Sequence, residues 1–139
     1  MKRQYEIIDH PADLGLRVFG KTREDLFSHA ARAMFEQIAD LSGIREDIRR
    51  SFTVEAPGLE ELLVYFLGEL LYLFTAEDLL LSKFTIKRMD DRHLEAEAGG
   101  EFFSSSPQQL KTEIKAVTYH NLKIEHQETG WKAEIIFDT

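Results

Sequence analysis

The sequence LEELLVYFLGELLYLF at residues 59–74 is the longest apolar stretch of this chain. It is shorter than the roughly 20 residues that a membrane-spanning helix needs, and it carries Glu60, Glu61 and Glu69. Its apolar residues occupy most sides of a helix, which is typical of a helix buried inside a domain. We therefore predict a buried helix over residues 59–74.

A second helix is predicted upstream, beginning at Thr22 and ending near Asp40. In the sequence TRED, Thr22 is a suitable N-cap, Asp25 follows three residues later, and Glu24 lies in the positive first turn of the helix. Apolar residues at a spacing of four mark the face that we expect to be buried: Leu26, Ala30, Met34 and Ile38.

The remaining segments have the alternation of β-strands. Because helices that are segregated from an antiparallel sheet pack on it as a separate layer, we predict an α+β fold. Its form is a two-layer sandwich, a mostly antiparallel β-sheet with two main helices, and residues 1–139 are expected to form a single domain. The predicted strands cover residues 5–8, 14–20, 51–56, 84–89, 93–101, 113–127 and 131–138, with a hairpin turn at residues 128–130.

Composition limits the possible partners. Acidic residues outnumber basic residues by 25 to 17, which gives a formal net charge of −8 and a pI near 5.1. Direct nucleic-acid binding is disfavoured because it depends on basic residues that neutralise phosphates. A basic protein partner or cations fit the charge better, although solubility alone also accounts for it. The absence of cysteine excludes disulfides and thiolate metal sites, and together with the lack of a signal-peptide pattern it leads us to expect a cytoplasmic protein.

The C-terminal sequence IIFDT is a candidate cation site. Asp138 follows an apolar strand, and Thr139 adds the terminal carboxylate, so two adjacent negative groups repel each other. Ca²⁺ or Mg²⁺, which prefer oxygen ligands, would relieve that repulsion. Asp13 would join the site if the first strands lie beside the last one. The alternatives are a solvated C-terminus and, for Asp13, a turn residue that bonds its own backbone.

Lys115 is the second unusual residue, in the sequence IKAVTYH. Alternation places it on the same face as Val117 and Tyr119, a face suited to burial. A half-buried lysine needs a carboxylate partner, whereas a lysine near a strand end can extend its ammonium group to water. Both interpretations remain open. In the segment before Asp13, Asp9 fits a turn residue, and His10 could be a ligand or a base, although a lone histidine beside a proline is more often structural.

These residues resemble the archease family. DHPADLGLRVFG at residues 9–20 is similar to the archease signature His-Thr-Ala-Asp followed by an apolar-Gly-apolar strand, and residues 59–74 resemble its central apolar helix. GE followed by EIKAVTYHNLKI resembles the most distinctive archease block, and WKAEIIFD resembles the archease ending. The matches follow the family order over nearly the whole chain.

The resemblance implies a function that composition alone does not reach. Archeases are protein cofactors of the GTP-dependent, RtcB-type RNA-splicing ligase, and they promote guanylylation of the ligase histidine and multiple turnover. The resemblance implies that this chain is not itself an enzyme. It implies a divalent cation held by Asp13, Asp138 and Thr139, and it adds Lys115 to the functional cluster. Asp40 and His120 are carried over less firmly.

The sequence departs from the family pattern at Pro11, Gln108 and Thr139, where Thr, His and a terminal Ile or Leu are usual. An alternative is a small metal-dependent acid–base enzyme that uses Asp13, Lys115 and His120 on its own substrate, although no nucleophile–base motif is visible. A third possibility is an interaction module whose metal ion only secures the C-terminus.

Overall fold

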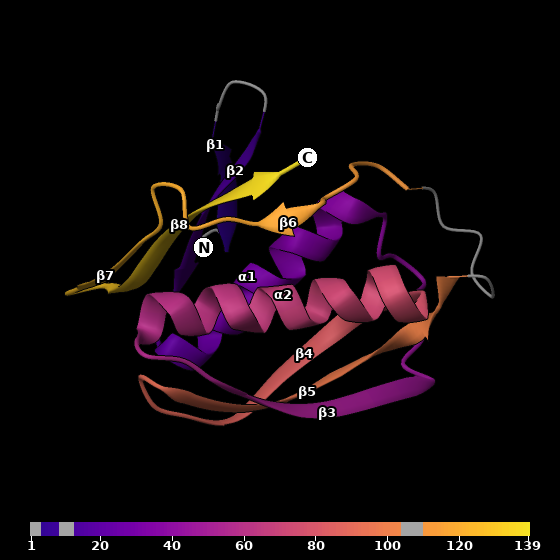
Figure 1. The fold of residues 1–139 in the computed structure, drawn as a ribbon, viewed down its shortest axis with the longest axis horizontal. Coiled ribbons are helices and arrows are strands. Elements are labelled where there is room, and N and C mark those ends of the chain that lie inside the picture. The colour runs from indigo at the N-terminus through magenta and orange to yellow at the C-terminus, as the bar shows by residue number, and fades with distance from the viewer. Residues whose placement is uncertain (1–3, 9–12, 104–109) are drawn as a thin grey trace.

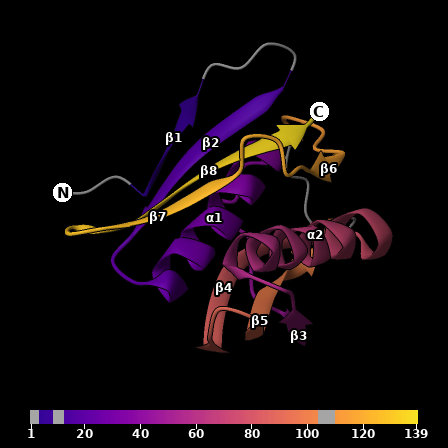
Figure 2. The ribbon, with the colours of Figure 1, turned by 60° about the vertical axis from the view of Figure 1, so that its left-hand side comes forward.

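Two helices lie between two β-sheets in the computed structural model, which describes residues 4–8, 13–103 and 110–139. The helices are α1 (Arg23–Ile38) and α2 (Leu59–Glu77). In Figure 1 a five-stranded sheet lies above them and a three-stranded sheet below, and the turned view in Figure 2 keeps the sheets on opposite sides of the helix pair. Because both helices contact both sheets, the core surrounds the helices.

The five-stranded sheet is organised around β8 (Gly130–Asp138). One edge of β8 pairs with β2 (Leu14–Gly20), which in turn pairs with β1 (Tyr5–Ile8). The other edge pairs with β7 (Lys123–Gln127) and with the two-residue β6 (Ala116–Val117). All these pairings are antiparallel. The fully buried side chains on the helix-facing side of β2 and β8 are Leu16, Val18, Ala133, Ile135 and Phe137.

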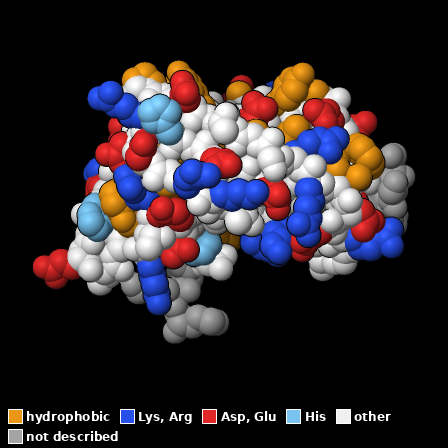
Figure 3. Space-filling view, turned by 90° about the horizontal axis from the view of Figure 1, so that it is seen from below, with side chains coloured by type: hydrophobic (Ala, Val, Ile, Leu, Met, Phe, Trp, Pro, Cys, Tyr) orange, Lys and Arg blue, Asp and Glu red, His pale blue; other side chains and the backbone are white. Residues whose placement is uncertain are grey.

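The three-stranded sheet has the antiparallel order β3 (Ile48–Glu55), β5 (His93–Phe102), β4 (Leu79–Met89). Its outer face carries interspersed basic and acidic side chains, which Figure 3 shows from the side of this sheet. Ion pairs cross between its strands, as between Arg88 and Glu95 (3.2 Å). The charged outer face of this antiparallel sheet is in contact with solvent, and the apolar inner face packs against the helices.

The start of α1 and the end of α2 each have an identifiable cause. Thr22 Oγ1 accepts a hydrogen bond from the Asp25 amide at 3.0 Å, so the predicted N-cap is confirmed. Asp78 adopts a left-handed conformation (φ 58°) after α2, and its amide bonds the Phe74 carbonyl. None of the helices in the described part of the chain combines the length and the apolar character required to cross a lipid bilayer.

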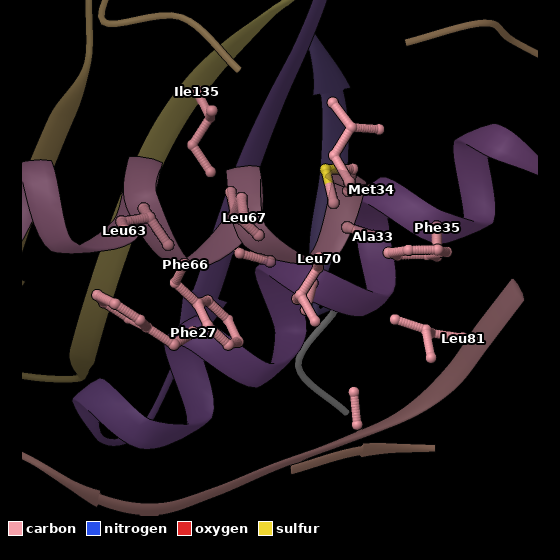
Figure 4. Close-up of a cluster of buried hydrophobic side chains, with 14 of the residues drawn as sticks. Phe27, Ala33, Met34, Phe35, Leu63, Phe66, Leu67, Leu70, Leu81 and Ile135 are labelled. Atoms are coloured by element: carbon pink, nitrogen blue, oxygen red, sulfur yellow. The ribbon is translucent and has the colours of Figure 1, made fainter. Parts of the chain in front are cut away.

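The helices meet through large apolar side chains, as Figure 4 shows. The ring of Phe66 on α2 lies 5.8 Å from that of Phe27 on α1 and 6.0 Å from that of Phe52 on β3. Leu63, Leu67 and Leu70 of α2 are fully buried as well. The apolar stretch is therefore buried because sheets cover it from two directions.

The α+β class, the two main helices and the antiparallel strands are confirmed. The strands nevertheless divide into two sheets, where one sheet was predicted. The strand predicted over residues 113–127 is interrupted between β6 and β7 by a turn in which Asn121 has a φ of 52°. β4 begins at Leu79 rather than at residue 84, because Leu79, Leu80 and Leu81 are buried against the helices.

Candidate functional site

Asp13 and Asp138 lie at the neighbouring ends of β2 and β8. Leu14 pairs with Phe137 and Gly15 with Ile136. Continuing this register by one residue places Asp13 opposite Asp138. Directly opposed residues of an antiparallel pair extend to the same face of the sheet, with Cβ atoms about 5 Å apart. The condition stated from the sequence, that the first strands lie beside the last one, is therefore met.

These two carboxylates project from the face of the sheet that points away from the helices. Leu14 and Phe137 pack toward the core, so the residues next to them point outward. The same outer face carries Arg17 between two carboxylates. Arg17 Nε donates to Glu134 Oε2 at 2.8 Å, and Arg17 also pairs with Glu6. These hydrogen bonds, that to Glu134 first, raise the pKa of Arg17.

Ile8, Gly15 and Ile136 lie between the charged group around Arg17 and the Asp13–Asp138 pair. A Cβ atom added to Gly15 would lie 3.2 Å from Ile136 Cδ1 and 3.3 Å from the Ile8 carbonyl oxygen. The glycine thus allows both isoleucines to close over the strand. This close packing explains the apolar-Gly-apolar pattern that follows Asp13 and fixes the position of the strand that presents it.

The backbone of Lys115 lies beside Asp138. The Lys115 amide donates to the Asp138 carbonyl at 2.7 Å, immediately before β6 pairs with β8. The expectation that Lys115 occupies a buried face is wrong, because β6 contains only Ala116 and Val117 and the side chain of Lys115 is exposed. Among the described residues it makes no ion pair. The side chain of Lys115 therefore starts from a backbone position next to Asp138 and extends into solvent.

Asp40 lies at the exposed end of α1, one residue after Ala39. Its Oδ1 accepts hydrogen bonds from the amide (3.0 Å) and the hydroxyl (2.8 Å) of Ser42. These bonds, assisted by the charge of Lys111, lower the pKa of Asp40. Asp40, Ser42 and Lys111 line a cavity of about 490 Å³ next to β1. The carboxylate is therefore held as an anion in a wall of that cavity.

A short segment connects the end of α1 with the end of β8. The Lys111 amide donates to the Ile38 carbonyl at 2.8 Å, and Lys115 bonds Asp138 as described above. Four residue steps span at most about 14 Å. Asp40 and the Asp13–Asp138 pair thus occupy the same end of the molecule without belonging to one cluster.

His120 lies in the exposed turn after β6, where its amide donates to Thr118 Oγ1 at 3.2 Å. Thr118 in turn bonds the Ile136 carbonyl through its hydroxyl, at 2.7 Å. The turn is thereby fastened to β8. Asp9, His10, Pro11 and Gln108 lie outside the described residues.

The donor chemistry at this end of the sheet fits a hard cation. Asp13 and Asp138 supply two carboxylates on one face, and Thr139 follows Asp138 directly. Over residues 4–8, 13–103 and 110–139, no group of three or more His, Cys, Asp or Glu side chains is arranged to hold a metal ion. The pair alone supplies fewer ligands than the six to eight oxygens typical of Ca²⁺. The metal site therefore stays a prediction, chemically suited but incomplete in side-chain donors.

Sequence reasoning missed Ser42 and Lys111, which bond or face Asp40, and the contact between Tyr119 and Tyr65. A residue pattern could have found Ser42, because Asp followed two residues later by Ser is a usual turn arrangement. Lys111 and the tyrosine contact depend on tertiary packing, for which the sequence carries no local signal.

Comparison with known proteins identifies the family of this chain. The chain matches the model of the Archease protein family over residues 5–139. It is 41% identical to protein archease of Methanosarcina barkeri, covering 98% of this chain and 96% of that one. It is 39% identical to protein archease of Pyrococcus furiosus, covering 98% and 99%.

Solved structures agree with the fold. The solution structure of protein 1598 of Methanobacterium thermoautotrophicum matches with a TM-score of 0.79 at 34% identity, covering 98% of this chain and 99% of that one. The crystal structure of a Thermotoga maritima archease, described as a possible chaperone, matches with a TM-score of 0.65 over the whole of both chains. At 23% identity, that second likeness concerns the fold alone. By its nearly full-length matches to family and relatives, this chain belongs to the archease family.

Proposed function

We propose that this protein activates an RtcB-type RNA-splicing ligase, promoting guanylylation of the ligase histidine and multiple turnover. The observation that supports this most directly is the register of β2 and β8, which sets Asp13 opposite Asp138 beside the backbone of Lys115. Those are the residues that the family resemblance assigns to activation, and they come from three separate segments. We propose that they act together on the partner, with Asp40 and His120 as secondary contributors.

The cation, in this proposal, is Ca²⁺ or Mg²⁺ held by Asp13, Asp138 and the carboxylate of Thr139. When bound, a divalent ion would supply positive charge that offsets phosphate charge in a nucleotidyl transfer. The contribution of the chain itself is to position the carboxylates of Asp13 and Asp138. Asp138 is exposed and Asp13 is half-buried at this end of the sheet, and the pairing of β2 with β8 holds the two strand ends next to each other.

Lys115 would pair with one of these carboxylates or with a nucleotide phosphate. Its exposed ammonium can reach either, because no ion pair with a described residue holds it. The net charge of −8 would speed association with a basic nucleotide-binding cleft, and we place this encounter in the cytoplasm. The protein itself would neither ligate RNA nor bind it strongly.

The test compares single-turnover and multiple-turnover ligation by the cognate ligase, with and without this protein. We expect guanylylation and multiple turnover to rise with the wild type and the Asp13→Ala/Asp138→Ala variant to lose the stimulation. Glu55→Ala, which removes an exposed carboxylate from the other sheet, serves as the matched control. Full stimulation by a folded double variant would reject the carboxylate mechanism. Activity on small substrates without the ligase would instead favour an acid–base enzyme.

A further inference from the structure

One face of α2 remains exposed although both sheets cover the rest of the helix. Its residues recur at helical spacing: Glu61, Tyr65, Gly68, Glu69 and Tyr72, here called the tyrosine stripe. Tyr65 is 43% exposed and Tyr72 is 58% exposed, although most of α2 is buried. Large aromatic side chains left in solvent on a rigid helix are characteristic of interaction surfaces.

Tyr119 extends the tyrosine stripe beyond the helix. It is 53% exposed and lies in the turn after β6, where its hydroxyl is next to that of Tyr65. Burial, followed by the interaction with Tyr65, raises the pKa of Tyr119, and the charge of Glu61 adds to the effect. Tyr119 is thus packed against the stripe, and its ring adds apolar area at one end of it.

A small residue separates the two helical tyrosines. A Cβ atom added to Gly68 would meet no heavy atom within 4 Å, so the surface between the rings is open. Tyr65 and Tyr72 lie about 10 Å apart along the helix axis, at 1.5 Å per residue. An extended side chain from another molecule can lie across that gap, with an aromatic ring at either end.

The charged residues of α2 itself are all acidic. Residues 59–77 contain four glutamates and no lysine or arginine. Glu77 pairs with Arg50 (3.3 Å), and Glu60 accepts a bond from the Ile124 amide. Glu61 and Glu69, which flank Tyr65, form no ion pair with any residue that the structure describes. The outer face of the three-stranded sheet differs, because there the acidic side chains are matched by basic ones (Figure 3).

We propose that the tyrosine stripe and Tyr119 form a docking surface for an arginine-bearing basic segment of a protein partner. A guanidinium group stacks on tyrosine rings and pairs with carboxylates, and tyrosine and arginine are enriched among residues that dominate binding energy. A second copy of the chain would set Glu61 and Glu69 against identical glutamates. RNA would bring phosphates to the same acidic face. Charge therefore selects a basic polypeptide over both.

The docking surface is continuous with the candidate site. Tyr119 follows Lys115 by four residues in the segment that pairs with β8, and β6 lies next to α2 in Figure 1. A partner held on the tyrosine stripe would thus lie beside the end of the sheet that carries Asp13 and Asp138. Identifying this partner as the ligase rests on the proposed function; the docking surface itself does not require activation to occur.

The test measures the Kd for the purified cognate ligase and, in parallel, the concentration of this protein that gives half-maximal stimulation. Tyr65→Ala/Tyr72→Ala is expected to raise both values about tenfold or more, as for central aromatic residues of interfaces. The maximal stimulation of the ligase, reached when this protein is saturating, should equal that of the wild type. Gly68→Lys is a second variant, which adds a positive charge in open space without disturbing the core. Thr85→Lys adds the same charge on the exposed outer face of β4 and is the matched control.

Each outcome decides the docking proposal separately from the proposed function. Weaker binding by the stripe variants with wild-type binding by Thr85→Lys supports it, whether or not the protein stimulates the ligase. Binding by the stripe variants equal to that of the wild type overturns it, even if Asp13→Ala abolishes stimulation. Absence of measurable wild-type binding to the ligase also overturns it. If binding is present and stimulation is absent, the docking surface stands and the proposed function fails.

Discussion

Asp138→Asn tests the candidate site through protein stability alone. The register of β2 and β8, continued by one residue beyond Leu14 and Phe137, sets Asp13 opposite Asp138. With Cβ atoms about 5 Å apart, the carboxylate centres lie roughly 6 Å apart, and two like charges at that distance in water repel by about 0.7 kcal/mol. Without divalent cations, the substitution removes this repulsion. We therefore expect Asp138→Asn to raise the free energy of unfolding by up to that amount at low salt.

With a cation bound, Asp138→Asn should lower the free energy of unfolding instead of raising it. A ligand that binds only the native state at a hundred times its Kd stabilises it by about 2.7 kcal/mol. Asp138→Asn removes one charged ligand and thus most of that gain. For a domain of this size, 1 kcal/mol corresponds to about 4 °C in Tm. The variant should melt about 3 °C above the wild type in EDTA and several degrees below it in excess Ca²⁺ or Mg²⁺.

Thermal unfolding followed by circular dichroism, with and without cation, measures both effects. Glu55→Gln is the control, because it removes one exposed carboxylate at the end of β3 and leaves the Asp13–Asp138 pair intact. Its response to cation should equal that of the wild type. A lower Tm of Asp138→Asn in EDTA, or an equal cation-induced shift in variant and wild type, would refute the reasoning.

Two further predictions concern the scaffold. Gly100→Ala should destabilise the fold by about 3 kcal/mol or more, since its Cβ would lie 2.0 Å from the Leu80 carbonyl oxygen, whereas Gly99→Ala should change stability little, because its nearest contact is 3.6 Å. Urea unfolding of both variants checks this, and a Gly100→Ala variant as stable as Gly99→Ala would contradict it. Burial and the hydrogen bond to Glu36 raise the pKa of Tyr5 from 10.0 to about 12. A raised folded-state pKa gives stability that is complete below pH 10 and is lost as the pH rises toward 12; Tyr5→Phe should flatten this loss in unfolding measured across that range, and an unchanged pH profile would argue against it.

Local physics explains why much of the fold was predictable from the sequence. The start of α1 depends on Thr22 and Asp25, which lie three residues apart, and the hydrogen bond between them forms within the helix itself. The hairpin between β7 and β8 depends on Gly130, whose φ of 136° favours glycine. In both cases the signal and the structure that it determines lie in the same few residues.

The division into two sheets depends on longer-range contacts. Alternation shows that a strand has two faces, but it does not say which other strand it pairs with. β2 pairs with β8, the last strand of the chain. β3 pairs with β5, although α2 and β4 separate the two strands in the sequence. For α2, which both sheets cover, the sequence indicated only that the helix is apolar on most sides. That pattern fits a helix covered from two directions, yet it does not specify what covers it.

In the candidate site as well, the sequence identifies single residues but does not show which of them lie close together. Asp13 and Asp138 could each be named, but their proximity follows from the β2–β8 register, which no local pattern fixes. Lys115 was expected on a buried face because alternation was continued through residues 113–127. The turn at Asn121 and the shortness of β6 interrupt that alternation, and Lys115 is exposed.

The two proposed surfaces differ in how they are built, and this difference has a measurable consequence. Tyr65 and Tyr72 project from a helix that both sheets hold in place, which suits a surface whose task is affinity. Asp13 precedes β2 and Asp138 is the last residue of β8, so both lie at one end of the five-stranded sheet, where side chains can enter a partner's cleft. If docking and activation are separate, substitutions in the tyrosine stripe should change the concentration dependence, and substitutions in the carboxylate pair should change the maximum. Combining Tyr72→Ala with Asp13→Ala should then give independent effects on the two parameters, because sites without shared contacts act additively.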